Sequence, residues 1–453
     1  MDCGIHKKKG GVTMKKKLAR VAALGLGVLM IGSLAACGNS TTTGGGGSDN
    51  AATSDNSAAA GGGGSTASSG DTIKVGVVYP QTGALAAFGD GTEEMYGYAV
   101  SEINAAGGVT VDGTQKQIEL VFADSQSDAT KASEAANNLI SSNGVQIMLT
   151  AKTADTTVPV AAACERAGIV CLSVDTPDEA WATSEYQYSF HAGFNTENEL
   201  NSFKDAWDAA GISGGKVAVM HATDTEGQTM INAISEFCEA NGYTAYDPGA
   251  YNSGDTDYTS IINNIKNEAC DAVVGVMLTS DFGTFFSQLK SSGYMPAVTT
   301  VAKATLFKSD VDAAGADGLA DGLCSEVWWT ASHPYISSIS GETCEDIADV
   351  WMELMPNYDY APATAGYDYA NVEILYNVLQ NAGSLSADAL VQAANDLNIE
   401  TVIGPVDFND QHYSVQPLVT GQWIYNEDGT WTQEIIANTQ VPDCPITADL
   451  KEN

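Results

Sequence analysis

Several hydroxyl-bearing side chains lie in two loops, 150–157 and 173–177, where they could donate hydrogen bonds to an anion. Together the loops carry Thr153, Thr156, Thr157 and Thr176. Hydroxyl and backbone N–H groups at the start of a helix bind an anion without a positive side chain, because the helix N-terminus has a partial positive charge. We expect that helix to begin near Thr157, so Thr156 or Thr157 could instead serve only as its cap.

The other polar residues form no recognisable catalytic or metal-binding group. His191, His221 and His333 are not spaced as metal ligands, and the sequence has no Ser/His/Asp grouping, phosphate-binding loop or GxGxxG motif that opens a helix. Glu93 and Glu94 fall in the first turn of an expected helix, where the helix dipole explains them. The sequence therefore predicts a protein that binds rather than catalyses, with no cofactor and no metal ion.

The first 36 residues have the features of an export signal. Lys15, Lys16, Lys17 and Arg20 precede an apolar run, 21–31, that is too short to span a bilayer comfortably. The letters LAAC, which end at Cys37, resemble a bacterial lipobox, so we expect cleavage before Cys37 and lipidation there. A lipid on Cys37 would anchor the chain at the outer face of the cytoplasmic membrane. In the alternative, an ordinary signal is cleaved and Cys37 has no role.

Residues 37–70 consist almost wholly of Gly, Ser, Thr, Ala, Asn and Asp. This composition cannot bury a core and is typical of a flexible linker. At about 5.5 Å × √n, the linker would reach on the order of 30 Å from its anchor. Met14 looks like the natural start, so we interpret residues 1–13 as an extension of the gene prediction.

The charge and length of the chain limit its partners. The sequence has 19 Lys and Arg against 57 Asp and Glu, for a net charge of −38. Nucleic acid and anionic membrane surfaces would repel such a chain, so we expect neither as a binding partner. After the linker, about 380 residues remain, which is right for two α/β lobes in a monomer.

Nine cysteines include Cys3, in the extension, and Cys37. The other seven show no CxxC spacing of a metal or redox site. Export permits disulfides without fixing how they pair. The hypothesis for one bridge is Cys238 with Cys270, near the ends of successive expected helices.

Strand-like apolar runs alternate with helical patterns from residue 73 onward. The first series has strands at 73–79, 118–123, 145–149 and 169–174, with helices around 95–103, 129–142 and 158–167. The second has strands at 216–220, 244–246, 272–277 and 297–300, with helices at 227–241, 258–267 and 280–291. Such βαβ series predict two doubly wound lobes with parallel sheets, which bind ligands outside the carboxyl ends of their strands. Later helical patterns at 345–354, 365–380 and 387–396, and strands at 406–408 and 423–425, would complete both lobes.

Several sequence motifs in order resemble one family, the periplasmic-binding-protein class that includes leucine/isoleucine/valine-, amide- and urea-binding proteins. The longest are VGVVYPQTGALAAFGDG at 75–91, EINAAGGV at 102–109 and DSQSDATKASEAANNLI at 124–140. Others are GDTDYTSIINNIK at 254–266, AGYDYANVEIL at 365–375 and IGPVDFND at 403–410.

This resemblance implies a type I periplasmic-binding-protein fold, in which two hinged lobes close on a ligand. The hinge crossings would fall near 190–194, 321–326 and 416–421. The implied first lobe comprises 71–191 and 325–417, and the second comprises 192–324 and 418–445. Closure would hide the ligand from water and create a surface that an ABC permease distinguishes from the open form.

The resemblance also implies which first-lobe residues touch the ligand. A ligand carboxylate would meet the backbone and hydroxyls of the two loops, at Thr153, Ala154, Asp155, Thr156, Thr157, Asp175 and Thr176. Phe88 matches an aromatic that covers the ligand in relatives, although it could instead anchor the two lobes to each other. Trp328 and Trp329 would lie at the cleft rim or be buried between lobe and tail.

The second lobe departs from the family pattern at two positions. Glu226 stands where branched-chain amino-acid binders often have an aromatic, and Lys303 lies where those binders provide a carboxylate for the ligand's ammonium. Glu226 could take the ammonium role, while Lys303 could bind a second ligand carboxylate or pair with Glu226 or Asp175. Either residue could equally be a solvated loop charge.

The resulting hypothesis is a lipid-anchored solute-binding protein of an ABC importer. Its ligand would be an amino acid, of the branched-chain type by resemblance, or a related small polar solute. The alternative is a ligand-binding sensor or receptor for amides, urea or small carboxylates.

Overall fold

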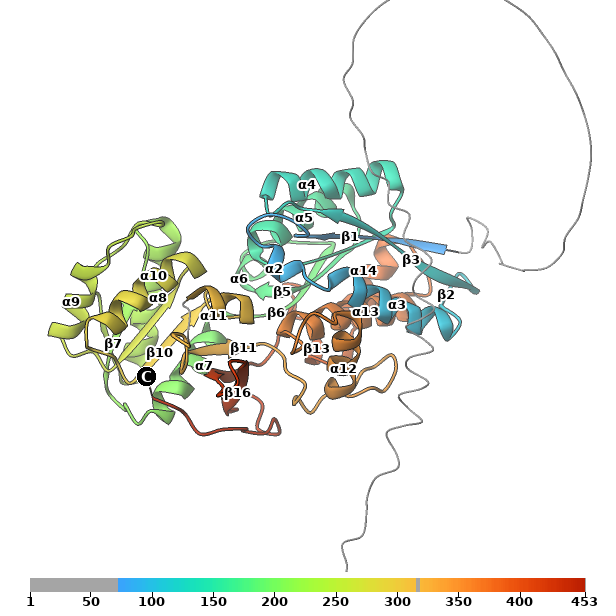
Figure 1. Ribbon diagram of the computed structural model, residues 1–453. Helices are drawn as coiled ribbons and strands as arrows, with labels where there is room; N and C mark the ends of the chain where they lie inside the picture. The colour runs from blue at the N-terminus through green and yellow to red at the C-terminus, as the bar shows by residue number, and fades with distance from the viewer. Residues whose placement is uncertain (1–71, 315–317, 453) are drawn as a thin grey trace, which may run out of the picture. The chain divides into compact units, whose positions relative to one another are not determined.

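The computed structural model describes residues 72–314 and 318–452, except for the side chains of Thr225, Glu226 and Ala314. The described chain forms two seven-stranded sheets and one two-stranded sheet, with helices packed on them (Figure 1). In this part of the chain no helix is both long and apolar enough to cross a membrane. The predictions for residues 1–70, including lipidation at Cys37, lie outside the described residues.

The first sheet has the strand order β14-β6-β5-β4-β1-β3-β2. Its strands are β1 (Thr72–Tyr79), β2 (Val109–Val111), β3 (Thr114–Asp124), β4 (Ile147–Ala151), β5 (Cys171–Pro177), β6 (Ser189–Phe194) and β14 (Tyr413–Val415). The pairs β1–β4, β4–β5, β5–β6 and β6–β14 are parallel. All five residues of β4 are buried, as expected for a central strand with both faces covered.

Helices cover both faces of this sheet. Helices α4 (Ala129–Asn138) and α5 (Ala154–Ala167) pack against each other on one face, while α3 (Thr92–Ala105) and α13 (Ala363–Ala382) pack together on the other (Figure 1). A single π-helical turn, η1 (Leu139–Asn143), extends α4. Fourteen of the twenty residues of α13 are buried, which makes it the central helix of its face. Helices α2 (Ala86–Gly89), α6 (Glu179–Ala182), α12 (Cys344–Leu354) and α14 (Ala387–Asn395) and the two-stranded sheet of β12 (Asn398–Thr401) and β13 (Gly404–Asp407) complete this region.

The second sheet has the order β16-β15-β11-β10-β9-β7-β8. Its strands are β7 (Lys216–Met220), β8 (Thr244–Tyr246), β9 (Ala272–Val276), β10 (Val298–Ala302), β11 (Cys324–Val327), β15 (Val419–Tyr425) and β16 (Trp431–Ala437). The pairs from β8 to β11 are parallel, whereas β15 joins β11 and β16 in antiparallel fashion. The antiparallel edge is therefore built by the tail of the chain.

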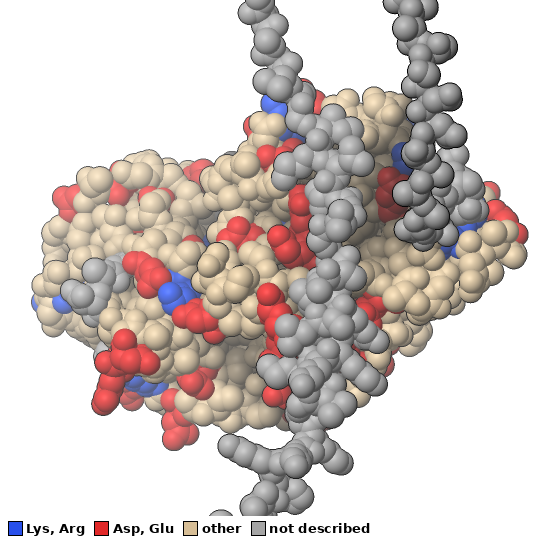
Figure 2. Space-filling model, turned by 45° about the vertical axis from the view of Figure 1, so that its right-hand side comes forward, with Lys and Arg blue, Asp and Glu red and all other residues tan. Residues whose placement is uncertain are grey.

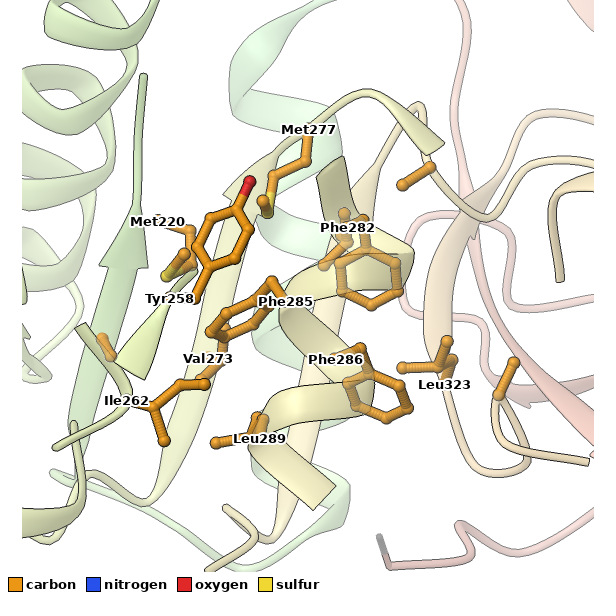
Figure 3. Packing of buried hydrophobic residues seen from close by; sticks show 14 of the residues in the cluster. Met220, Tyr258, Ile262, Val273, Met277, Phe282, Phe285, Phe286, Leu289 and Leu323 are labelled. Atoms are coloured by element: carbon orange, nitrogen blue, oxygen red, sulfur yellow. The ribbon is translucent and has the colours of Figure 1, made fainter. Parts of the chain in front are cut away.

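Two apolar clusters fill the faces of the second sheet. Helices α7 (Thr196–Ala209) and α8 (Thr225–Ala240) contribute residues such as Phe203 and Ile234 to one cluster. Helices α9 (Thr259–Asn267), α10 (Thr279–Ser291) and α11 (Lys308–Ala314) contribute to the other. Figure 3 shows Phe282, Phe285, Phe286 and Leu289 of α10 on the side of the helix that packs toward the sheet. Their spacing places them on one helical face, which explains the amphipathic pattern of the sequence.

The predicted fold class is confirmed, with differences in some elements. The expected helix at 158–167 begins earlier, at Ala154, and a short helix, α2, lies between the expected strand at 73–79 and the expected helix around 95–103. Helices α7 and α11 and strand β2 were not predicted. Helix α7 follows β6 directly and begins after Asn195, whose side chain accepts a hydrogen bond from Asn198 N and caps the helix, so this cap was an available signal.

The predicted Cys238–Cys270 bridge is wrong. Both thiols are free and buried, as are the other five cysteines of the described chain. Cys238 packs in the cluster of α7 and α8, whereas Cys270 packs in the cluster of α9 to α11. The two side chains thus lie on opposite faces of one sheet, and a strand layer separates them.

The chain passes three times between the two sheets. It leaves the first sheet after β6, returns after β11 and leaves again between β14 and β15.

Acidic side chains outnumber basic ones on the face of the molecule that Figure 2 shows, in keeping with the net charge of −38.

Candidate functional site

The loop between β4 and α5 presents backbone N–H donors and the half-buried hydroxyl of Thr153. Thr153 has a left-handed φ of 66° and its side chain makes no capping hydrogen bond to α5. Ala154 and Asp155 are exposed at the start of the helix, where the first N–H groups have no acceptor within the helix. An anion at this position would meet these N–H groups and the positive end of the helix dipole.

Two of the predicted hydroxyl residues of this loop, Thr156 and Thr157, are buried. The Thr156 hydroxyl donates to the Lys152 carbonyl at 2.7 Å, so it fastens the loop. The Thr157 hydroxyl is buried and has no hydrogen-bond partner among the described residues. Neither hydroxyl caps α5 in the manner considered from the sequence, since the N-cap residue is Thr153.

The second predicted loop forms the end of β5. Asp175 and Thr176 are buried, and Asp175 has a left-handed φ of 71°. The Thr176 hydroxyl donates to the Pro177 carbonyl at 3.2 Å. Strands β4 and β5 are parallel neighbours, with Ala151 paired to Val174, so the two predicted loops lie side by side at one edge of the sheet.

Lys152, in the first of these loops, was not predicted as a site residue. Its side chain lies between Asp175 in the second loop and Asp368 on α13. Its ammonium is 3.0 Å from Asp175 Oδ2 and 2.8 Å from Asp368 Oδ1, and all three side chains are 0% exposed. Lys152 itself has a φ of 73°. The signal in the sequence was a lysine directly after the strand residues 148–151, because a charge that follows a buried strand must find a partner or reach solvent.

The electrostatics of this group favour a charged lysine. Burial lowers the pKa of Lys152, but the carboxylates of Asp368 and Asp175 more than offset it, so its pKa is raised. Burial raises the pKa of Asp175, and it raises the pKa of Asp368 to about 6, against the attraction of Lys152 in both cases. The group carries one cation between two carboxylates and is closed to solvent.

Lys303 does not pair with Asp175, whose ionic partner is Lys152. Lys303 directly follows β10, is exposed and has a φ of 65°. It lies close enough to Glu199 to lower the pKa of that carboxyl. The side chain of Glu226 lies outside the described residues, so its proposed role remains a prediction.

Two buried carboxyl groups in the second lobe were not predicted. Glu199 lies in the first turn of α7 and Glu326 in β11. Burial raises the pKa of Glu199 to about 7, although Lys303 opposes the shift. Burial and then the neighbouring Glu199 raise the pKa of Glu326 well above its usual value. This pair of acids next to Lys303 occurs where α7 and β11 leave the hinge crossings.

Aromatic rings connect the two lobes beside these groups. Phe88 is half-buried and meets Phe307, which follows β10, edge to face at 4.8 Å between ring centroids. Trp328 stacks 6.4 Å from Phe88 and 5.0 Å from Phe194, at the end of β6. Trp329 is buried against Gly366 of α13, where a Cβ atom would come within 2.3 Å of the indole. Phe88 therefore touches the second lobe, and its role in covering a ligand remains a prediction.

The carboxyl ends of β7 and β9 add a mixed surface. His221 follows β7, and its Nε2 lies 3.1 Å from Asp247 Oδ1. Leu278 follows β9 and is 56% exposed, which is unusual for a leucine at the start of a helix. A surface hollow of about 440 Å³ lies elsewhere, between α9 and the last turn of α10, and is lined mainly by polar residues such as Asn263 and Gln288. The strand ends, where the polar and aromatic groups converge, are the better candidate site.

Comparisons with known proteins find relatives over most of the chain. A family model described as periplasmic binding protein matches residues 72–430. A Leu/Ile/Val-binding protein homolog of Brucella abortus is 23% identical over 377 residues, which cover 79% of this chain and 92% of the relative.

Solved structures of the same fold match this chain over almost their full lengths. The branched-chain amino-acid transporter substrate-binding protein LivJ of Streptococcus pneumoniae, in complex with isoleucine, is 21% identical, has a TM-score of 0.64 and matches over 81% of this chain and 99% of its own. A solute-binding protein of an ABC transporter from Rhodopseudomonas palustris, in complex with 3,4-dihydroxybenzoic acid, is 18% identical, has a TM-score of 0.63 and matches over 84% and 99%. The likeness to both structures is one of fold.

Proposed function

Because this chain belongs to the periplasmic binding protein family, we propose that it captures an amino acid of the branched-chain type for an ABC importer. Its fold is the type I periplasmic-binding-protein fold, and the family binds solutes, so the chain is not an enzyme. The Brucella relative named for leucine, isoleucine and valine and the isoleucine complex of LivJ support this ligand class.

The observation that carries the proposal is the uncapped N-terminus of α5 beside the end of β5. It offers backbone N–H groups and a helix dipole to an anion, with no positive side chain exposed among the residues of either loop. A zwitterion suits such a site, since its carboxylate is bound by dipoles while its ammonium can meet an acid of the facing lobe. We assign the carboxylate to the N–H groups at Ala154, Asp155 and Thr156.

In the second lobe we propose Glu226 for the ligand's ammonium and the exposed Leu278 for its apolar side chain. Phe88 would close over the ligand from the first lobe, and Lys303 would discriminate among ligands with a second carboxylate. The three connections between the sheets would act as the hinge. Lipidation at Cys37 would keep the protein near its permease at the outer face of the cytoplasmic membrane.

The test is a binding screen with ligand-free protein. The chain without its first 36 residues is unfolded in denaturant, refolded and titrated calorimetrically with L-leucine, L-isoleucine, L-valine, L-glutamate, urea and 3,4-dihydroxybenzoate. We expect one site per chain, binding of the branched-chain amino acids, and a rise in melting temperature with ligand concentration. Binding of urea or dihydroxybenzoate alone would contradict the proposed ligand class, and silence across the panel would contradict the transport role.

A further inference from the structure

The buried ion triad of Lys152, Asp175 and Asp368 joins segments that the candidate site must hold together. Lys152 follows β4, Asp175 belongs to the end of β5, and Asp368 lies on α13. The ammonium is 3.0 Å and 2.8 Å from the two carboxylates, and it also donates to the Thr364 carbonyl at 3.5 Å. None of the three side chains reaches solvent, so none can touch a ligand.

The triad coincides with the strained backbone of the site. Lys152, Thr153 and Asp175 have φ values of 73°, 66° and 71°, a region that non-glycine residues rarely adopt because it is strained. Such conformations persist only where the surroundings fix them. Two of these three residues, Lys152 and Asp175, also belong to the triad, and each lies in one of the two loops of the candidate site.

Helix α13 acts as the common support. Beyond Asp368, it carries Asn371, whose amide donates to the Thr150 carbonyl at 3.3 Å. Asp368 also accepts a hydrogen bond from the Thr92 hydroxyl at the start of α3, at 3.1 Å. One buried helix thereby holds the ends of β4 and β5 and the N-terminus of α3 through polar contacts.

We propose that Lys152 is a positioning residue, which binds Asp175 and Asp368 to hold both first-lobe loops so that the first N–H groups of α5 face the ligand carboxylate. This inference rests on the proposed function for its ligand, but the positioning itself is a property of the free protein. Burying these charges costs free energy of folding, but a rigid anion site loses less conformational entropy when it binds its ligand.

The test uses two carboxylate-to-amide variants, Asp175→Asn and Asp368→Asn, each of which leaves Lys152 one ionic partner. Asparagine tolerates the left-handed backbone of Asp175, so the first variant removes charge without adding backbone strain. The matched control is Glu373→Gln, on the same helix. Glu373 is also fully buried and accepts hydrogen bonds from Ser338 N at 2.6 Å and Val402 N at 2.9 Å, away from the two loops.

The first measurement is hydrogen exchange of the ligand-free proteins. We expect peptides that cover 150–157 and 173–177 to exchange at least about threefold faster in Asp175→Asn and in Asp368→Asn, and at the wild-type rate in Glu373→Gln. Equal exchange in all four proteins, or equal acceleration in the control, would overturn the proposal. If one aspartate variant does not fold, the other decides.

The second measurement is the Kd for L-isoleucine. We expect at least a tenfold weaker affinity in each aspartate variant and a change below twofold in Glu373→Gln, even where their melting temperatures fall equally. Unchanged affinity in the aspartate variants, with isoleucine bound by the wild type, would refute positioning. Failure of the wild type to bind isoleucine would instead contradict the proposed ligand, and the exchange experiment would still decide the role of Lys152.

Discussion

The two lobes carry the same local feature with opposite outcomes. Each has an Ala-Lys pair where a parallel strand ends, at Lys152 after β4 and at Lys303 after β10, and both lysines have a left-handed backbone with φ of 73° and 65°. Lys152 is fully buried between two aspartates, whereas Lys303 is exposed. Helix α13 packs against the neighbouring β5 and provides Asp368 as an ionic partner of Lys152.

The carboxylates around the two lysines differ in the same way. In the first lobe the buried acids contact their cation directly. In the second, Glu199 and Glu326 are buried near each other, and Lys303 opposes only part of the resulting rise in the pKa of Glu199. The first-lobe edge thus holds a cation in direct contact with two acids, whereas the second-lobe edge holds Glu199, whose pKa is raised to about 7 mainly by burial.

The largest effect is expected from removing the buried lysine. Lys152→Met should lower the free energy of unfolding by about 3–5 kcal/mol, because it leaves two aspartates buried without a cation. Urea denaturation at pH 7.5 measures the change, with Lys303→Met as the control, for which we expect less than about 1 kcal/mol. Equal losses in the two variants would contradict the contrast between the lobes.

The next effect is a dependence of stability on pH from Glu199. Its pKa of about 7 lies above that of an unfolded glutamate, so the folded protein holds the extra proton between these values and stability falls as pH rises through them. Between pH 4.5 and 8 the loss from this residue should be on the order of 2–3 kcal/mol. Glu199→Gln should flatten the curve of unfolding free energy against pH.

The exposed Glu197, in the same turn of α7, provides the control for this prediction. Glu197→Gln should keep the wild-type curve. An unchanged slope in Glu199→Gln would show that this carboxyl is not protonated at neutral pH.

A smaller effect is expected from the aromatic contact between the lobes. Phe88→Ala removes the edge-to-face pair with Phe307, and such pairs contribute about 0.5–1.5 kcal/mol beyond the area they bury. We expect about tenfold weaker binding of L-isoleucine by calorimetry, with Phe88→Leu intermediate because leucine retains apolar bulk. Wild-type affinity in Phe88→Ala would show that Phe88 only packs the lobes together.

The smallest effect on stability, and the most selective on binding, is expected from Lys303→Met. It should weaken ligands with a second carboxylate, such as L-glutamate, more than L-isoleucine, because only the former would use the exposed ammonium. Competition against a bound fluorescent probe measures the two affinities. An equal loss for both ligands, or no loss, would exclude Lys303 as a specificity residue.

Much of the fold was predictable because buried parallel strands appear in a sequence as continuous apolar runs. Strands β7 and β8 match their predicted bounds, and the helical pattern over Phe282 and Phe286 gave α10 within one residue. The misses include α11, which has only seven residues, and α7, which is separated from β6 by the single residue Asn195.

The candidate site was predictable only as two loops. The sequence indicated the loops around Thr153 and Asp175, and the structure places them side by side. The sequence could not indicate that the Thr156 and Thr157 hydroxyls are buried or that a sheet separates Cys238 from Cys270. It also could not indicate that Glu199, near Lys303, is buried. Each of these depends on which face of an element meets a neighbour far along the chain.

The alternation of strands and helices, the acidic charge and the family could be recognised without a structure, since these reside in local patterns and motifs. Which of two similar lysines is buried depends on how the chain folds. The letters around Lys152 and Lys303, TAKTA and VAKAT, are nearly alike, and local backbone geometry is alike as well. A buried charge is fixed by partners that folding brings to it, and Asp368 reaches Lys152 only when α13 packs on the completed sheet.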